Sequence, residues 1–134
     1  MTDPEVRVLT QSIERDRAEV YGFLADPRNF AKWASGLGAG LEPSGTEWTA
    51  QGPEGPVRIR FAPRNEYGVL DHVVTVAPGV EVYVPMRVTA NADGTGSLVT
   101  FTLFRQPGMS DEKFAADADW VHRDLDTLKK LLEA

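Results

Sequence analysis

Apolar and polar residues alternate over most of the middle of the chain, a pattern typical of β-strands. Short turn sequences rich in Pro, Gly, Asn and Asp separate the alternating segments. These segments cover residues 5–14, 46–51, 57–62, 68–77, 80–90 and 96–105. Connections as short as the later ones join antiparallel neighbours, because a parallel pair needs a long crossover. The pattern predicts an antiparallel sheet of about six strands.

Helical spacing replaces this alternation at two places. Asp16 precedes Glu19 by three residues, a capping-box pattern, and the pair Asp26-Pro27 repeats a helix-start signal. Two short helices are therefore expected after the first strand. A long helix is predicted from Ser110 onward, with acidic residues in its first turn and lysines near its end. One apolar stripe runs along it and comprises Phe114, Ala118, Val121, Leu125, Leu128 and Leu132.

Two segments between these elements depart from simple periodicity. Residues 36–45 are rich in glycine and are predicted to form a loop. The sequence at 36–40 is no dinucleotide-binding fingerprint, because it follows a helix and lacks a phosphate-binding lysine. Pro85 interrupts the segment 80–90 and is expected to mark a bulge or a sheet edge, since proline removes a ladder donor. Neither segment resembles a linker, so residues 1–134 are expected to form a single domain.

Composition narrows the classes of function. The chain has 134 residues, of which 42% are hydrophobic, a net charge of −6, no cysteine and two histidines. Scattered negative charge disfavours nucleic acid and anionic membranes as partners. The lack of cysteine excludes a thiol nucleophile and effectively excludes structural zinc, and no metal or other cofactor is expected. No leader-like or membrane-spanning segment is evident, which predicts a cytoplasmic protein without membrane insertion.

The segment 68–77 contains the most informative polar residue. Its more apolar face carries Leu70, Val74 and Val76, and His72 shares that face. His72 is therefore expected to point inward, and the adjacent Asp71 to point to the opposite face. These two neighbours cannot form an orienting acid–histidine pair with each other. A single inward histidine is compatible both with a hydrogen-bonded core residue and with an acid–base catalyst.

Several inward residues are candidates for the wall of a binding cavity, since such cavities are mostly apolar with few polar groups. Asp117 and Asp124 lie on one shoulder of the helix stripe, and Asp117 is predicted at the mouth of the cavity. Each candidate, taken alone, is equally compatible with ordinary core or a solvated flank. The predicted ligand-binding residues are Trp33, Trp48, Phe61, His72, Val74, Met86, Phe101, Phe114 and Asp117.

The order of these elements resembles the START-like, or SRPBCC, superfamily, which includes birch-pollen-allergen-like proteins and bacterial polyketide cyclases and dehydratases. The resemblance covers essentially the whole chain, and is carried by residues 13–33, 67–72 and 84–88 and by the helix from Ser110. It implies an α+β helix-grip fold, in which a curved antiparallel sheet wraps around a long C-terminal helix. It also implies a cavity for a small hydrophobic or aromatic molecule. No universal active-site motif can be transferred, because fold alone does not fix function.

Three functions therefore remain open. The first is binding of a small hydrophobic molecule, by a protein that is either a monomer or a homodimer. The second is a polyketide cyclase- or dehydratase-type enzyme in which His72 serves as catalytic acid or base, with Tyr83, Arg87 or Asp117 as its partner. The third is a protein–protein adaptor, for which the exposed aromatic candidates are Tyr67, Tyr83 and Trp120.

Overall fold

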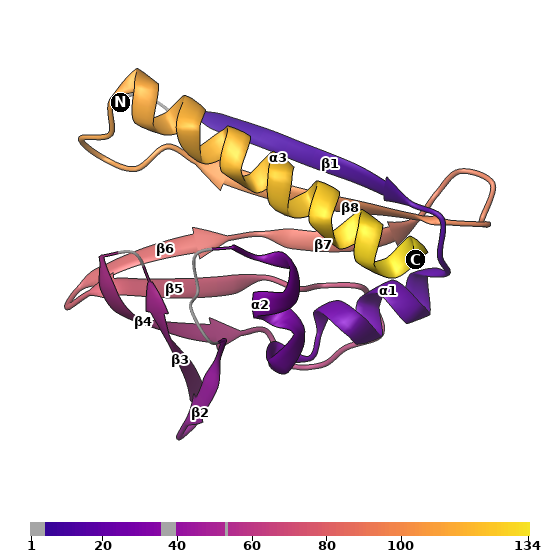
Figure 1. The fold of residues 1–134 in the computed structure, drawn as a ribbon, viewed down its shortest axis with the longest axis horizontal. Helices are drawn as coiled ribbons and strands as arrows, with labels where there is room; N and C mark the ends of the chain where they lie inside the picture. The colour runs from indigo at the N-terminus through magenta and orange to yellow at the C-terminus, as the bar shows by residue number, and fades with distance from the viewer. Residues whose placement is uncertain (1–4, 36–39, 53) are drawn as a thin grey trace.

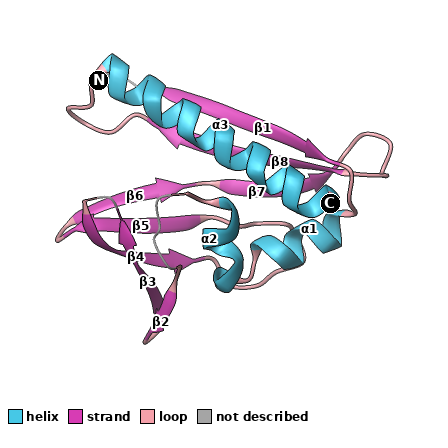
Figure 2. Cartoon of the chain, in the orientation of Figure 1, coloured by secondary structure: helices cyan, strands magenta, loops and turns pink. Residues whose placement is uncertain are grey.

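The chain folds into two antiparallel sheets that a long helix crosses on one side (Figures 1 and 2). A computed structural model describes residues 5–35, 40–52 and 54–134. The elements are β1 (Val6–Ile13), α1 (Arg17–Leu24), the 3-10 turn η1 (Pro27–Asn29), α2 (Phe30–Trp33), β2 (Glu42–Ser44), β3 (Glu47–Gly52), β4 (Gly55–Phe61), β5 (His72–Ala77), β6 (Val80–Val84), β7 (Met86–Ala90), β8 (Ser97–Phe104) and α3 (Asp111–Glu133). The predicted α+β helix-grip architecture is confirmed.

The two sheets meet at Pro85. One sheet has the order β1-β8-β7 and the other the order β2-β3-β4-β5-β6, with antiparallel neighbours throughout. β6 ends at Val84 and β7 begins at Met86, so the predicted strand over 80–90 is divided between the sheets. The backbone N–H of Met86 donates to the carboxylate of Asp71 at 2.9 Å. A side chain thus satisfies a donor at the point where proline breaks the ladder.

Each helix begins at the residue that the sequence indicates. The side chains of Asp16 and Asp26 accept from the backbone N–H two residues on, both at 3.0 Å. Ser110 Oγ accepts from the backbone N–H of Lys113 at 3.1 Å. The expected capping box is incomplete, because Glu19 pairs with Arg15 at 3.6 Å. Helix starts depend on local contacts, which explains why they are predictable.

Two strand boundaries differ from the prediction. Residues 42–44 form β2 inside the expected loop, and residues 36–39 of that loop, which include most of the 36–40 glycine sequence, lie outside the described part of the chain. β5 begins only at His72, after an isolated bridge between Val69 and Arg87, and Gly68 before that bridge has a φ of +77°. A Cβ on Gly68 would lie 2.1 Å from the carbonyl oxygen of Val88, so this backbone approach requires glycine.

The hydrophobic core lies beneath α3 and beside α1 and α2. Leu125 and Leu128 of α3 are fully buried against it. Val76, predicted to face inward, is 45% exposed, and the β5–β6 register shifts at this point, between Thr75 and Ala77. Among the described residues, no helix is long and apolar enough to cross a membrane.

Candidate functional site

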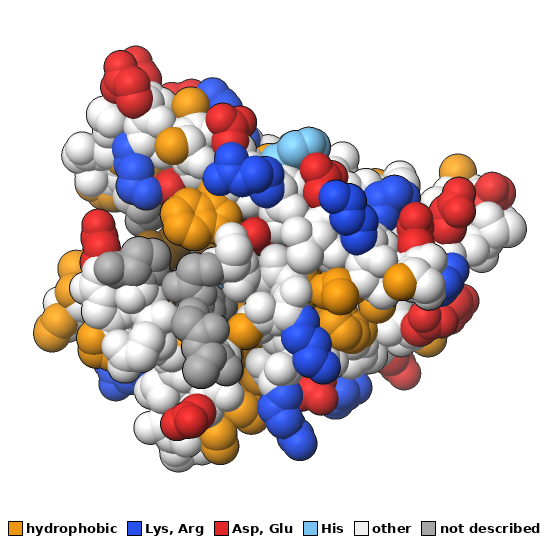
Figure 3. Space-filling model, viewed as in Figure 1, with side chains coloured by type: hydrophobic (Ala, Val, Ile, Leu, Met, Phe, Trp, Pro, Cys, Tyr) orange, Lys and Arg blue, Asp and Glu red, His pale blue; other side chains and the backbone are white. Residues whose placement is uncertain are grey.

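Two neighbouring hollows lie between the five-stranded sheet and α3. The inner chamber has a volume of about 180 Å³, and its walls come from α2, β5, β6, β8 and α3. The outer hollow has a volume of about 320 Å³ and lies between the β3–β4 end of the sheet and α3. Hydrophobic side chains are visible beside the depression below α3 (Figure 3). The inner chamber is lined by Phe30, Trp33, Ala34, Ser35, His72, Val74, Val84, Phe101, Val121 and Asp124.

His72 is the buried polar residue in the wall of the inner chamber. It is the first residue of β5, opposite Phe61 of β4 and Val84 of β6, and only 4% of its surface is exposed. Its ring lies 5.6 Å from that of Phe30, 5.7 Å from Phe61 and 6.5 Å from Phe101, between centroids. Three aromatic rings therefore pack around the imidazole.

The hydrogen bonding of His72 assigns its proton. Nδ1 lies 3.1 Å from the backbone carbonyl oxygen of Leu70. A carbonyl only accepts, so Nδ1 donates, and in the neutral ring Nε2 then carries the lone pair. Burial lowers the pKa of His72 below its usual value, because the apolar surroundings disfavour the charged form. Near pH 7 the ring is neutral, with Nε2 available as an acceptor or a base.

Two ring nitrogens at the chamber lack hydrogen-bond partners among the described residues. Trp33 Nε1 is the one side-chain nitrogen or oxygen there that is fully buried and unpaired. His72 Nε2 also has no partner in that part of the chain.

A hydrogen-bonded network of Ser35, Trp120 and Asp124 stands at the mouth of the inner chamber. Trp120 Nε1 donates to Ser35 Oγ. Ser35 donates to Asp124 Oδ1 from Oγ at 2.7 Å and from its backbone N–H at 3.2 Å. Burial raises the pKa of Asp124 above its usual value. Ser35 and Asp124 line the inner chamber whereas Trp120 lines the outer hollow, so this mouth network connects the two spaces.

The structure brings four of the predicted ligand-binding residues together. Trp33, His72, Val74 and Phe101 all line the inner chamber. Phe61 stands behind the His72 ring, and also packs against Phe30 at 5.6 Å between ring centroids. These residues come from four elements that are distant in the sequence, and the topology alone makes them neighbours.

The other four predicted residues lie elsewhere. Trp48 is partly buried on β3, and Met86 is buried in the core at 2% exposure. Phe114 is buried beneath the guanidinium groups of Arg7 and Arg105, whose Cζ atoms lie 5.0 and 5.9 Å from its ring centroid. None of the three lines the inner chamber.

Asp117 is held by a neighbour on its own helix. Its carboxylate pairs with Lys113 at 2.6 Å, and it is Lys113 that lines the outer hollow. Asp124, on the same shoulder of the stripe, is the acid that reaches the inner chamber. Helical spacing places both acids on the same shoulder of the α3 stripe. Only Asp124 lies beside α2, and therefore only Asp124 reaches the inner chamber.

Sequence reasoning missed Phe30 and Val121 as chamber residues. Phe30 shares the inner face of the short helix with Trp33, and Val121 belongs to the α3 stripe. Helical spacing therefore indicated that both side chains point inward. Ser35 carried none, because its role depends on Asp124, which is far away in the sequence.

Asp71 immediately precedes β5, and its side chain contacts Tyr83 and Arg87, whereas the side chain of His72 is buried. The Asp71 carboxylate accepts from Arg87 Nε at 2.9 Å and Nη2 at 2.8 Å, and from Tyr83 Oη at 3.1 Å. The Arg87 hydrogen bonds hold the pKa of Asp71 below its usual value. A further hollow of about 430 Å³ borders this cluster. Tyr83 and Arg87, predicted as possible partners of His72, are thus engaged with Asp71.

Among the described residues, no group of three or more His, Cys, Asp and Glu side chains could hold a metal ion. The chamber instead offers aromatic and aliphatic walls, a neutral imidazole acceptor and an acidic mouth. Such a surface can hold an apolar molecule by burial and can orient one polar group.

Comparison with known proteins supports the fold. No family model matches the chain. No curated protein matches it either. Among solved structures, an uncharacterized protein from Bacillus thuringiensis superposes with a TM-score of 0.77 at 14% identity, covering 96% of this chain and 98% of the other. The Bet v 1-like allergen Ara h 8.0201 superposes with a TM-score of 0.67 at 14% identity, covering 97% and 98%.

A third solved structure is DynU16, a protein from the dynemicin biosynthetic locus. It superposes with a TM-score of 0.70 at 21% identity, covering 99% of this chain and 48% of that protein. This chain therefore spans about half the length of DynU16. At such low identities these likenesses establish the fold alone, and the chain has the helix-grip fold.

Proposed function

We propose that this protein binds a small hydrophobic molecule in the inner chamber. The observation that carries the proposal is a space of about 180 Å³ whose walls are mostly apolar and come from five elements. Burial of apolar ligand surface there supplies the binding free energy.

Native mass spectrometry of the purified protein, compared with its denatured mass, tests this proposal. A bound small molecule leaves on unfolding, so the native mass should exceed the denatured mass by the mass of an apolar compound. Extracted protein should then rebind that compound. Where no compound co-purifies, titration with toluene followed by NMR is the second test, and no shift of chamber resonances would contradict the proposal.

A second function, acid–base catalysis of the cyclase or dehydratase type, is favoured by one observation. His72 lines this chamber and its Nδ1 is engaged with a carbonyl, which leaves Nε2 as the nitrogen that can remove a proton from a carbon next to a carbonyl group. The likeness to a protein from a biosynthetic locus agrees with this alternative. His72→Phe separates the two functions: a binder keeps most of its affinity for apolar molecules, whereas an enzyme loses about 10²–10⁴ in rate.

The adaptor alternative receives less support from the exposed aromatic side chains. Tyr83 donates its hydroxyl proton to Asp71, and Trp120 donates its indole proton to Ser35. Both side chains therefore already have partners within the chain. Tyr67, at 73% exposure, is the third candidate.

A further inference from the structure

β1 is an outer strand of the three-stranded sheet, and its backbone groups point alternately to its two sides (Figure 1). The backbone N–H of Arg105 donates to the carbonyl of Glu5 at 2.9 Å, so the odd-numbered residues of β1 form the hydrogen-bonded pairs with β8. The N–H and C=O groups of the even-numbered residues therefore point away from β8. Lys129 Nζ donates to the carbonyl of Ser12 at 2.8 Å from this outer side.

α3 protects only one end of this outer side. Its side chains form hydrogen bonds with the backbone of Ser12 and of Glu14. Within the described part of the chain, the outward backbone groups of Val6, Val8 and Thr10 have no hydrogen-bond partner. These groups form the open edge of β1. Unpaired backbone groups on an outer strand are a template for another strand.

The open edge lacks the devices by which natural sheets discourage strand addition. The pairing of β1 with β8 is regular along its whole length, and residues 6–10 contain no proline and no lysine. Their one charged side chain, that of Arg7, extends toward α3, where its Cζ atom lies 5.0 Å from the ring centroid of Phe114. β2, an outer strand of the other sheet, has only three residues, and one of them is Pro43. The two outer strands therefore differ in how well they resist pairing.

Exposed apolar side chains accompany the open edge. Val6 and Val8 are 42% and 60% exposed, and β-branched residues of this kind favour strand pairing. Both side chains lie on the same face of the strand as Thr10. A strand added at this edge covers part of both valines as well as the unpaired backbone groups. Hydrogen bonding and burial of apolar surface then act together.

A second copy of β1 is complementary to this edge. Two antiparallel copies related by a two-fold axis at Val8 place the two Val8 residues opposite each other. In this register Val6 lies opposite Thr10, and Arg7 lies opposite Leu9, so no like charges face each other. The outward backbone groups of the three even-numbered residues all meet outward groups of the other copy.

The neighbouring registers are less favourable. An axis at Arg7 places two arginines directly opposite each other, and like charges in that position destabilise a strand pair. An axis at Leu9 places Val6 opposite Ser12, whose carbonyl already accepts from Lys129. The sequence of the edge and the position of α3 therefore both favour the axis at Val8.

We propose that the protein associates with a second copy of itself through the open edge of β1, which joins the three-stranded sheets of the two copies across a two-fold axis at Val8. Two chains of net charge −6 repel each other, and residues 6–10 contain no acidic side chain, so this segment allows a close approach. The proposal is independent of ligand binding, because no residue of β1 lines the inner chamber.

Sedimentation velocity of the full chain at pH 7.5, over about 5 to 500 μM, tests the association. One strand pair buries less than the roughly 800 Å² per partner of a standard interface, so we expect a reversible dimer with a dissociation constant of about 10–100 μM. Val8→Lys places two like charges at the axis and should weaken the dimer at least about tenfold. Val80→Lys, which replaces a valine of β6 that is 49% exposed, is the matched control and should leave the dimer unchanged.

Cysteine cross-linking tests the register, because the chain has no cysteine of its own. Val8→Cys should form a disulfide-linked dimer when diamide is added, since opposite Cα atoms in a hydrogen-bonded antiparallel pair lie about 5.5 Å apart, within the range of a disulfide. Val6→Cys alone should not, because its opposite residue is Thr10. A mixture of Val6→Cys with Thr10→Cys should restore the cross-link.

The results that overturn the proposal are distinct from those that concern the ligand. A chain that stays monomeric at about 500 μM overturns it, and so does a dimer whose dissociation constant Val8→Lys leaves unchanged. Cross-linking of Val6→Cys as fast as that of Val8→Cys overturns the register. Cysteine is close to valine in size and Val8 is exposed, so the cross-linking result does not depend on whether Val8→Lys folds.

Discussion

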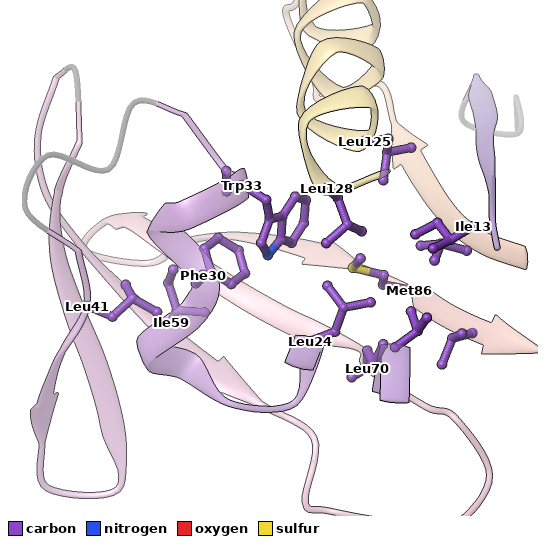
Figure 4. Close-up of a cluster of buried hydrophobic side chains, with 14 of the residues drawn as sticks. Ile13, Leu24, Phe30, Trp33, Leu41, Ile59, Leu70, Met86, Leu125 and Leu128 are labelled. Carbon is purple, nitrogen blue, oxygen red and sulfur yellow. The ribbon is translucent and has the colours of Figure 1, made fainter. Parts of the chain in front are cut away.

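The space beneath α3 is filled at one end and hollow at the other, although a single helix covers both. At the filled end, Leu125 and Leu128 are fully buried among Ile13 and Met86, as the converging side chains in Figure 4 show. At the hollow end, Val121 and Asp124 of α3 line the inner chamber instead. One continuous amphipathic stripe therefore serves both as core and as cavity wall.

The difference arises from the sheets and not from the helix. α3 lies close to β1 and to α2. The five-stranded sheet, whose last strand β6 ends just before Pro85, diverges from α3 (Figure 1). Side chains of similar size fill the narrow end of the resulting wedge and leave space at the wide end. Hydrophobic periodicity reports which face is buried, and the divergence of the sheets decides whether that face is packed.

Truncation of a leucine at the filled end should have the largest effect. Leu125→Ala is expected to lower the free energy of unfolding by about 2–5 kcal/mol, because it opens a new cavity in packed core. Val121→Ala at the hollow end should cost only about 1 kcal/mol, since its methyl groups already border open space. Urea denaturation followed by circular dichroism measures both, and equal losses would show that the two ends are packed alike.

A larger side chain should affect ligand binding at the hollow end and stability at the filled end. Phe101→Trp adds volume inside the inner chamber and should weaken toluene binding by at least about tenfold while the protein stays folded. Met86→Trp adds similar volume to the filled end and should cost about 1–3 kcal/mol of stability through overpacking. Calorimetry and urea denaturation distinguish the two. Unchanged toluene affinity in Phe101→Trp would show that this ring is not part of the binding site.

The pH dependence of stability reports on the burial of His72. Burial lowers its pKa in the folded state, so between that value and the unfolded value of about 6.5 the unfolded state binds more protons. The contribution of the neutral, buried imidazole to the free energy of unfolding is then fully present above about pH 6.5. It falls as the pH drops through that window, by up to about 1.4 kcal/mol per pH unit.

His72→Phe should lack this pH-dependent component. Urea denaturation of both proteins at pH 7.5 and 5.5 isolates the effect, because Asp71 and Asp124 are present in each. The loss of stability between the two pH values should be larger in the unmodified protein. Parallel losses would mean that the imidazole reaches water more easily than its surroundings suggest.

The smallest effect is expected at Trp33. Trp33→Phe removes the buried Nε1–H that lacks a partner among the described residues, and the relief offsets part of the lost packing. We expect the free energy of unfolding to change by less than about 1 kcal/mol, a value that thermal denaturation can bound. A loss of about 3 kcal/mol or more would show that the packing of the indole in the core outweighs the relief of the unpaired donor.

The fold was predictable where short-range rules decide it. The caps at Asp16, Asp26 and Ser110 act within one helical turn, and Pro85 breaks a strand by its own chemistry. β2 was missed because three residues are too few to show an alternating pattern. Its strand conformation depends on its pairing with β3. Local propensity and pattern therefore account for the elements, and less well for their short edge strands.

The candidate site was only partly predictable for a related reason. Alternation correctly predicted that the His72 side chain is buried and that the neighbouring Asp71 side chain points elsewhere, toward Arg87. It could not distinguish Phe101, which lines the inner chamber, from Phe114, which two arginines cover. Periodicity gives the direction of a side chain, whereas its neighbours follow from how sheets and helices are assembled.

The pairing of β1 with β8 has a consequence for how the protein is made. β1 is the first strand of the chain and β8 the last, and they pair along their whole length, from Val6 opposite Phe104 to Ile13 opposite Ser97. During synthesis β1 must wait for nearly the entire chain to leave the ribosome, and such long-range pairing forms slowly. Phe101, on β8, closes the chamber wall only at that stage, so a nascent chain has no site at which to capture a ligand.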